Sequence, residues 1–191
     1  MNNIFSKKSN VVYFCFILFL LILICFFENK NLNDKTKILD TTNERITTTL
    51  ILTTSEEDFF KIEEEEFKML AKLVYREARG IPSKTEQAAV IWCVLNRVDS
   101  QEFPNNIPDA ITQPFQFANI NNTPVEEEFL ELSKDVVKRW ILEKNGYANV
   151  GRVLPKEYLY FLGDGKHNNF RKDFNNIKDI WGWNLDSPYD N

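Results

Sequence analysis

Apolar residues recur every three or four positions in long segments of the chain, and this spacing predicts amphipathic helices. The first segment opens on the acidic run Glu63–Glu66, where negative charge complements the helix dipole, and it ends before Gly80. The second opens on Ser83 and carries Glu86 three residues later, which is the pattern of a capping box. Its apolar residues continue at helical spacing as far as Val98, so we expect a second long helix there.

A third long helix is predicted after Thr123-Pro-Val-Glu126, where the capping pattern recurs with proline at the first helical position. Its apolar stripe ends near Gly146. A short turn of helix is expected up to about Gln113, and the aromatic run Tyr158–Phe161 is the best strand candidate. The fold class is therefore mainly α, with a short C-terminal part rich in β-structure and loops.

Val11 to Phe27 is an uninterrupted run of 17 apolar residues without charge, glycine or proline. That length is at the short end of what spans a bilayer, so residues 11–27 are predicted to form a single N-terminal transmembrane helix. Lys7 and Lys8 precede the run, which favours residues 1–10 inside the cell and the rest outside. A cleaved signal peptide with a secreted product is the alternative. Large aromatic residues at the end of the run, where a signal peptidase prefers small ones, favour the anchor.

The rest of the chain divides by composition. Residues 28–62 are rich in Asn, Thr, Lys and Glu and are predicted to be a flexible polar linker. Residues 63–176 contain the helical pattern and are predicted to form the one catalytic domain, because 191 residues with 43% hydrophobic content provide one sizeable core. Residues 177–191 are expected to be a C-terminal tail.

Charge and cysteine content exclude several classes of protein. Beyond Lys7 and Lys8, 21 basic residues face 28 acidic ones, which gives the exported part a net charge of about −7. This balance gives no support for nucleic-acid binding, which needs a basic face. Of the three cysteines, only Cys93 lies outside the apolar run, so neither a disulfide framework nor a zinc site is expected. Cys93 is best interpreted as a small buried hydrophobe.

Glu77 is the residue most suited to chemistry. It follows Leu70 and Val74 at helical spacing, so its carboxylate falls on the apolar stripe in the last turn of the first helix. Desolvation and the negative end of the helix dipole both favour the protonated form of a carboxylate in that place. A general acid needs such a proton to give to a leaving group.

Three segments together resemble the SleB-type cell wall hydrolase family: Leu-Val-Tyr-Arg-Glu77-Ala-Arg-Gly80, the run from Gln87 to Val98 that contains Leu-Asn-Arg, and Gln113-Pro-Phe-Gln-Phe117. The resemblance covers roughly residues 66 to 174. It implies a lysozyme-like helical fold, activity on the glycan of bacterial peptidoglycan, and Glu77 as the catalytic acid. The chain departs from the family pattern at Ile81, where a second glutamate is usual.

The mechanism depends on whether a second carboxylate works beside Glu77. Of the acids that follow it, Glu86 is assigned to helix capping, and no other falls on an apolar stripe. One acid suffices when the 6-hydroxyl of the muramic acid attacks, and the resemblance also implies this lytic transglycosylase chemistry. A muramidase that uses water and a non-catalytic glycan-binding module are the alternatives. No metal or organic cofactor is expected.

Five further residues are candidates for substrate binding: Gln116, Phe117, Asn96, Tyr160 and His167. Amides and aromatic faces suit sugar hydroxyl groups and rings, and Gln116 is expected to face the cleft. For Phe117 and Tyr160, packing in the core is the alternative. Asn96 ends the second helix, where a buried structural hydrogen bond is an equal alternative. His167, the only histidine of the chain, is otherwise an incidental surface residue.

Overall fold

The computed structural model describes residues 46–54, 56–59, 61–114, 116–117, 119–176 and 178–190. The chain divides into two compact units, residues 1–50 and 51–191. Within the described ranges, no helix has both the length and the apolar character needed to cross a bilayer. The predicted transmembrane segment 11–27 lies outside those ranges, and so does the first part of the predicted linker.

Helical structure is present within the segment expected to be a flexible linker. Residues 46–50, the described part of the first unit, are helical. In the second unit, residues 51–54 and 56–59 are also helical. Phe59 and Ile62 pack against the hydrophobic core, and the Phe59 ring lies 5.3 Å from that of Phe67. Packing of the second unit therefore begins before residue 63.

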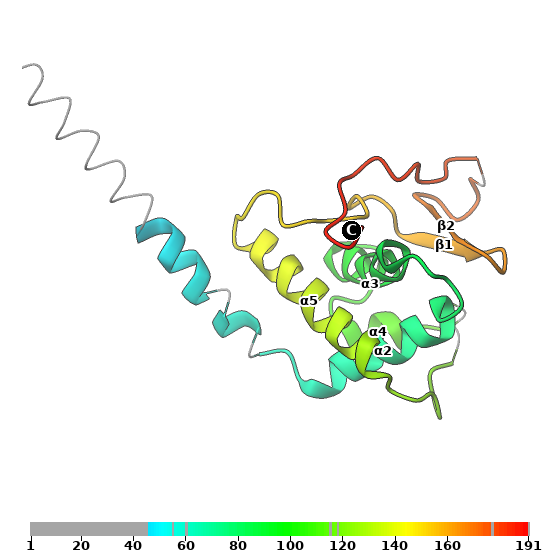
Figure 1. The fold of residues 1–191 in the computed structure, drawn as a ribbon, viewed down its shortest axis with the longest axis horizontal. Helices are drawn as coiled ribbons and strands as arrows, with labels where there is room; N and C mark the ends of the chain where they lie inside the picture. The colour runs from blue at the N-terminus through cyan, green and yellow to red at the C-terminus, as the bar shows by residue number, and fades with distance from the viewer. Residues whose placement is uncertain are drawn as a thin grey trace, which may run out of the picture. The chain divides into compact units, whose positions relative to one another are not determined.

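Beyond residue 62, four helices and one hairpin build the described part of the domain (Figure 1). The helices are α2 (Glu64–Ala78), α3 (Lys84–Asp99), α4 (Ile107–Thr112) and α5 (Glu127–Lys144). Helices α2, α3 and α5 contact one another pairwise, and α4 packs on α2 and α3. The prediction of a mainly helical domain with a short β-containing C-terminal part is confirmed. The lysozyme-like character that the resemblance implies stays a prediction.

Helix α3 is the centre of this packing. Apolar side chains are buried on all its faces, from Ala88 to Val98, because helices, hairpin and loops surround it. The buried surface of α3 is therefore much wider than the single apolar stripe that the sequence spacing predicts. Cys93 lies on α3 with no exposed surface, and burial raises the pKa of its thiol to about 11. The interpretation of Cys93 as a buried hydrophobe is confirmed.

The C-terminal part of the domain contains an antiparallel hairpin, β1 (Tyr160–Gly163) and β2 (Asn168–Arg171). The strand predicted at 158–161 thus begins two residues later. The N–H of Tyr158 bonds to the Pro155 carbonyl and closes a turn there, so Tyr158 precedes the strand. The second strand was not predicted. Phe170 is buried in the hydrophobic core and anchors β2 to it.

Helix α5 begins at Glu127, although the capping pattern predicts a start just after Thr123. The N–H of Thr123 bonds to the Ile120 carbonyl at 3.2 Å, so this threonine closes the preceding turn. Asn122 in that turn has a positive φ of 59°. Residues 123–126 are not helical, and the Glu126 carbonyl accepts the first hydrogen bonds of the helix. The expected cap at Thr123 is therefore wrong by three residues.

The segment expected to be a C-terminal tail folds back on the domain. Tyr189 donates its hydroxyl hydrogen to Asp135 of α5 at 2.6 Å, and Thr85 of α3 donates to Asp190 at 2.6 Å. Burial alone would raise the pKa of Asp135, but hydrogen bonds from Arg139 and Tyr189 outweigh it and lower that pKa. Trp181 is buried against Tyr158. The last described residues thus join α3 to α5.

Candidate active site

A cleft of about 410 Å³ lies between the end of α2 and the turn of the β1–β2 hairpin. One wall consists of residues 76–81, which are the last turn of α2 and the loop that follows it. The other wall consists of Gly163 and residues 165–168. Gly165 has a φ of +90°, a conformation that favours glycine and that lets the chain reverse between the strands. The cleft thus joins segments about 90 residues apart in sequence.

Glu77 is half-buried in the first wall, one residue before the end of α2 at Ala78. Its neighbours on the helix, Val74 and Ala78, are buried in the core. Ile81 closes the wall, and its N–H bonds to the Ala78 carbonyl at 3.0 Å. Among the described residues that line the cleft, Glu77 is the one carboxylate. The structure therefore places the predicted acid at the end of a helix and facing a cleft.

Glu86 is a second, almost fully buried carboxylate behind the other wall, with 4% of its surface exposed. One carboxylate oxygen accepts the N–H of Asn168, and the other lies 3.2 Å from Nδ1 of His167. Both partners line the cleft, whereas Glu86 itself does not. Glu86 therefore holds the hairpin turn in place without lining the cleft itself.

The expected role of Glu86 as a capping residue is wrong. Ser83 does cap α3, since its hydroxyl oxygen accepts the Glu86 N–H at 3.2 Å. The Glu86 side chain does not return to Ser83, however, because two groups of the hairpin face it on the buried side of α3. A buried carboxylate is costly unless it accepts hydrogen bonds, and the hairpin provides them.

Asn168 connects the two walls of the cleft. Its side-chain amide donates to the backbone carbonyl of Glu77 at 3.1 Å, while its own N–H donates to Glu86. Asn168 has 3% of its surface exposed, so this connection is shielded from water. The position of the Glu77 backbone thus depends on the hairpin, and the hairpin depends on Glu86.

Phe117 and Tyr160, both candidates for substrate binding, lie in an aromatic cluster around Arg97. The Arg97 guanidinium lies over Phe103, Phe117 and Tyr160 at 4.9, 4.4 and 5.5 Å from the ring centres. Arg97 has 2% of its surface exposed, its Nε donates to the Leu159 carbonyl at 2.6 Å, and burial lowers its pKa. The cluster places both rings in packing roles.

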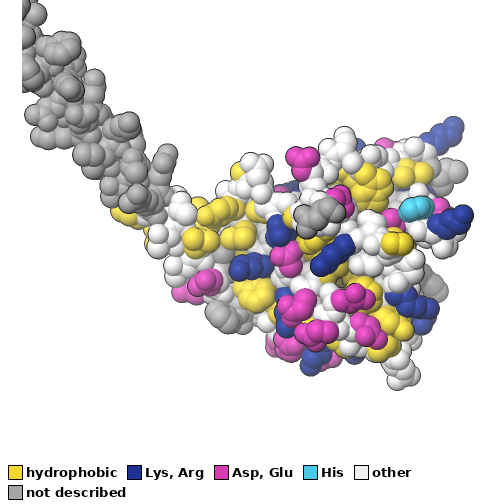
Figure 2. Space-filling model, in the orientation of Figure 1, with side chains coloured by type: hydrophobic (Ala, Val, Ile, Leu, Met, Phe, Trp, Pro, Cys, Tyr) yellow, Lys and Arg dark blue, Asp and Glu magenta, His cyan; other side chains and the backbone are white. Residues whose placement is uncertain are grey.

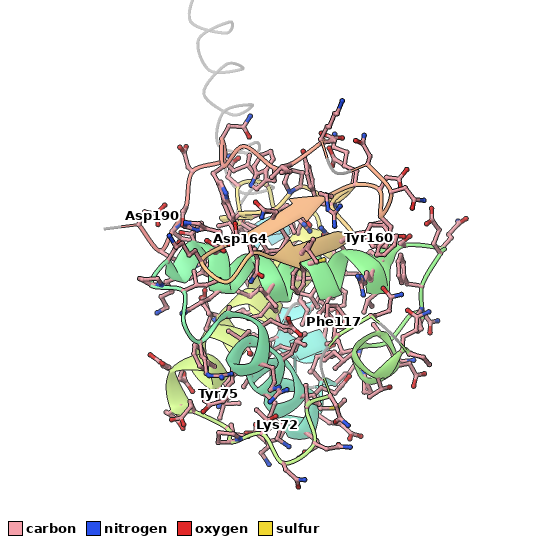
Figure 3. The ribbon with its side chains drawn as sticks, turned by 90° about the vertical axis from the view of Figure 1, so that its right-hand side faces the viewer. Lys72, Tyr75, Phe117, Tyr160, Asp164 and Asp190 are labelled. Atoms are coloured by element: carbon pink, nitrogen blue, oxygen red, sulfur yellow. The ribbon has the colours of Figure 1, made fainter. Side chains whose placement is uncertain are left out.

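This aromatic cluster lies away from the Glu77 cleft. Figure 3 shows Tyr160 at one end of the hairpin, with Phe117 below it, and Asp164 at the other end. Three residue steps of β1 separate Tyr160 from Gly163, which corresponds to about 10 Å at the usual rise of a strand. Neither Tyr160 nor Phe117 lines the cleft, and Phe117 instead lines a separate pocket of about 280 Å³. The structure therefore does not bring these two residues to Glu77.

Asn96 is buried, with 3% of its surface exposed, and has a structural role. Its amide donates to the carbonyls of Pro155 at 2.8 Å and of Tyr158 at 3.1 Å, and its oxygen accepts from Arg152 at 2.7 Å. These contacts fit the structural alternative for Asn96, since the loop before β1 uses its hydrogen-bonding groups. Gln116 is half-buried in the turn after α4 and is not among the residues that line the cleft.

His167 is the candidate that the structure does place in the cleft. The residues that sequence reasoning missed there are Arg76, Arg79, Lys166 and Asn168. Arg76 and Arg79 flank Glu77 in sequence, so their proximity was available as a signal. Asn168 and Lys166 flank His167, but no local pattern indicates that their turn faces α2.

Comparison with known proteins finds related sequences. A family model described as Cell Wall Hydrolase matches residues 82–180, about half of the chain. The match contains α3 and the whole hairpin, and it begins five residues after Glu77. No solved structure matches the chain.

Curated relatives with the name spore cortex-lytic enzyme match shorter segments. The protein of Bacillus subtilis (strain 168) is 32% identical over 72 residues, which are 38% of this chain and 23% of the relative. That of Halalkalibacterium halodurans is 37% identical over 57 residues, 30% of this chain and 17% of the relative. That of Bacillus cereus is 29% identical over 92 residues, 48% of this chain and 34% of the relative. The matched parts thus span about a third or less of these relatives.

Proposed function

This chain belongs to the cell wall hydrolase family, and from that premise we propose that it cleaves the glycan strands of peptidoglycan between MurNAc and GlcNAc. The observation that carries the proposal is the cleft, in which the one carboxylate among the described lining residues is half-buried Glu77. A helical core with a hairpin opposite the acid also suits the lysozyme-like fold that we propose for the domain.

Glu77 acts in this proposal as the general acid and then as the general base. The residues matched by the family begin at 82, so its role rests on its position in the cleft. Asn168 holds the backbone carbonyl of Glu77, and Ile81 closes the same wall. A side chain that transfers a proton needs such a fixed position next to the reacting bond.

The reaction that needs the fewest groups is a lytic transglycosylation. Glu77 gives its proton to the glycosidic oxygen, and the bond between that oxygen and C1 of the MurNAc breaks. The 6-hydroxyl oxygen of the same sugar bonds to C1, and its proton passes to the Glu77 carboxylate. The products are a 1,6-anhydro-MurNAc end and a free 4-hydroxyl on GlcNAc, and Glu77 returns to its protonated state. No water is consumed.

Direct hydrolysis needs a second carboxylate about 5 to 9.5 Å from the acid. Glu86 is a buried carboxylate whose two partners, His167 and Asn168, line the cleft. Both its oxygens face the hairpin turn, however. The described residues that line the cleft provide no other acid. This arrangement supports the single-acid reaction, and it also supports an enzyme over a glycan-binding module, which needs no half-buried acid.

Mass spectrometry of digested peptidoglycan tests the reaction. Purified sacculi are incubated with the protein, and the soluble fragments are analysed without chemical reduction. We expect muropeptides that end in anhydro-MurNAc and are lighter by one water than hydrolytic products. Digestion by a muramidase in parallel provides the hydrolytic reference masses. Fragments that match the reference alone contradict transglycosylation, and no release of fragments contradicts catalysis.

Residues 11–27 are proposed to anchor the protein in the cell membrane, with the catalytic domain on the extracytoplasmic side. The length of the apolar run and the lysines before it support this placement. In a cell fractionation, we expect the full chain in the membrane pellet after a high-salt wash and its release by detergent. A variant that lacks residues 1–27 is expected in the cytosol. Recovery of a shortened protein in the medium indicates signal cleavage and contradicts the anchor.

A further inference from the structure

Three cationic side chains surround Glu77 in the cleft, and they come from both of its walls. Arg76 and Arg79 lie at the end of α2, and Lys166 lies on the turn of the hairpin. All three side chains are exposed. No ion pair joins any of them to an acidic residue in the part of the chain that the structure describes. Their charge is therefore available to a molecule in the cleft.

The charge of this cleft differs in sign from that of the whole protein. Three cations and one carboxylate give the lining a local charge of about +2 when Glu77 is ionised, whereas the chain carries −5. In the view of Figure 2, Lys and Arg side chains lie beside and below the cyan His167. Acidic side chains also lie beside it, although most of those visible on that face lie farther away. Walls of one sign raise the local concentration of ligands of the other sign.

Helix energetics explain only part of this arrangement. Cations at the C-terminal end of a helix are favourable, which accounts for Arg76 and Arg79 on α2. Lys166 belongs to the opposite wall, on the turn of the hairpin, so the end of α2 does not account for it. Arg79 is also held in place, since its Nη1 donates to the Tyr75 carbonyl at 3.2 Å and its guanidinium lies 4.9 Å from the Tyr75 ring centre. A fixed guanidinium favours recognition over general solubility.

We propose that Arg76, Arg79 and Lys166 bind carboxylates of the peptide stems that the MurNAc residues carry. This inference rests on the proposed function and adds to it the substrate class, a glycan with anionic peptides. Stem peptides bring acidic residues and a free C-terminus close to the glycosidic bond whose oxygen Glu77 protonates. Guanidinium groups pair with carboxylates through two parallel hydrogen bonds, and a lysine adds a point charge. The preferred substrate is therefore peptide-bearing glycan.

Chemical modification of the substrate separates the charge of the stems from the rest of the wall. The full chain in non-ionic detergent is incubated with three preparations of sacculi: native, treated with hydrofluoric acid to remove phosphate polymers, and coupled to ethanolamine with carbodiimide to neutralise carboxylates. Release of fragments gives kcat and KM, and co-sedimentation gives binding without catalysis. We expect neutralised carboxylates to raise the KM by about 10-fold or more, and removal of phosphate to leave it unchanged.

Variants of the cleft then show which side chains are responsible. Arg76→Gln, Arg79→Gln and Lys166→Gln are each expected to raise the KM on native sacculi by about 2- to 5-fold, with small change in kcat. The triple variant should have the same KM on native and neutralised sacculi. Lys178→Gln, an exposed lysine outside the cleft, is the matched control and should behave as the wild type.

Each other result overturns the inference or the proposed function, and the two failures can be told apart. The inference is overturned if the KM of the wild type is equal on native and neutralised sacculi. It is also overturned if the KM rises after removal of phosphate alone. The absence of any cleavage contradicts the proposed function, while co-sedimentation still tests the inference. If no cleavage occurs, equal binding of the wild type to native and neutralised sacculi also overturns the inference.

Discussion

Replacement of Glu77 by glutamine is expected to reduce the release of peptidoglycan fragments by a factor of about 10² to 10⁴. Glutamine has nearly the same shape and keeps the hydrogen-bonding capacity of the side chain, but it cannot give up or accept the proton that the reaction transfers. Glu77 is half-buried at the end of α2 and its backbone carbonyl is held by Asn168, so the substitution should leave the fold intact. Fragment release is measured by reducing ends or by the loss of turbidity of sacculi.

Glu128→Gln provides the control for this experiment. Glu128 is exposed in the first turn of α5 and lies outside the cleft, so its replacement removes the same charge without touching the site. We expect wild-type rates and an unchanged midpoint of thermal unfolding for Glu128→Gln, and also an unchanged midpoint for Glu77→Gln. A Glu77→Gln protein that retains more than a tenth of the wild-type rate would show that another group provides the proton.

Glu86→Ala is expected to destabilise the domain and to lower activity. The substitution leaves the Asn168 N–H without its acceptor in a buried place, which costs about 1–3 kcal/mol of unfolding free energy. It also releases the hairpin turn that lines the cleft, so we expect kcat to fall by more than the loss of folded protein explains. Unfolding in urea, monitored by tryptophan fluorescence, measures the first effect, and rates at low temperature, where the protein is folded, measure the second.

Glu86→Gln distinguishes the shape of this side chain from its charge. A glutamine oxygen can accept the Asn168 N–H, and its amide group can donate to Nδ1 of neutral His167. We therefore expect Glu86→Gln to recover most of the stability and activity that Glu86→Ala loses. If Glu86→Gln is instead as inactive as Glu77→Gln while fully folded, Glu86 takes part in proton transfer and the single-acid reaction is wrong.

The helices and the main acid were predictable because they depend on local patterns. The first helix starts at Glu64 and ends at Ala78, within a residue or two of the bounds that its acidic start and Gly80 indicate. Glu77 could be singled out since an apolar stripe and a helix end are both visible in its immediate sequence. The start of α5 was missed because the turn that contains Thr123 uses the backbone bond to Ile120.

The other wall of the cleft was not predictable from local patterns. Glu86 has a sequence environment that fits capping, and only the fold brings the turn at His167 and Asn168 against it, about 80 residues later. The same holds for Asn96, whose partners Pro155 and Tyr158 lie about 60 residues away. The packing of the chain determines which hydrogen-bond partners a buried polar residue has, and the spacing of residues in the sequence does not indicate those partners.

The pairing of Asn168 with Glu77, 91 residues apart, also affects the order of events when the protein is made. A chain that emerges N-terminus first presents α2 long before the hairpin exists. Contacts between such distant residues form slowly, because the loop between them must be closed first. The acid is thus present early in an incomplete cleft, and a chain cut short before β2 lacks the second wall. Activity of this protein therefore requires that synthesis has passed β2 and that the hairpin has folded onto α2.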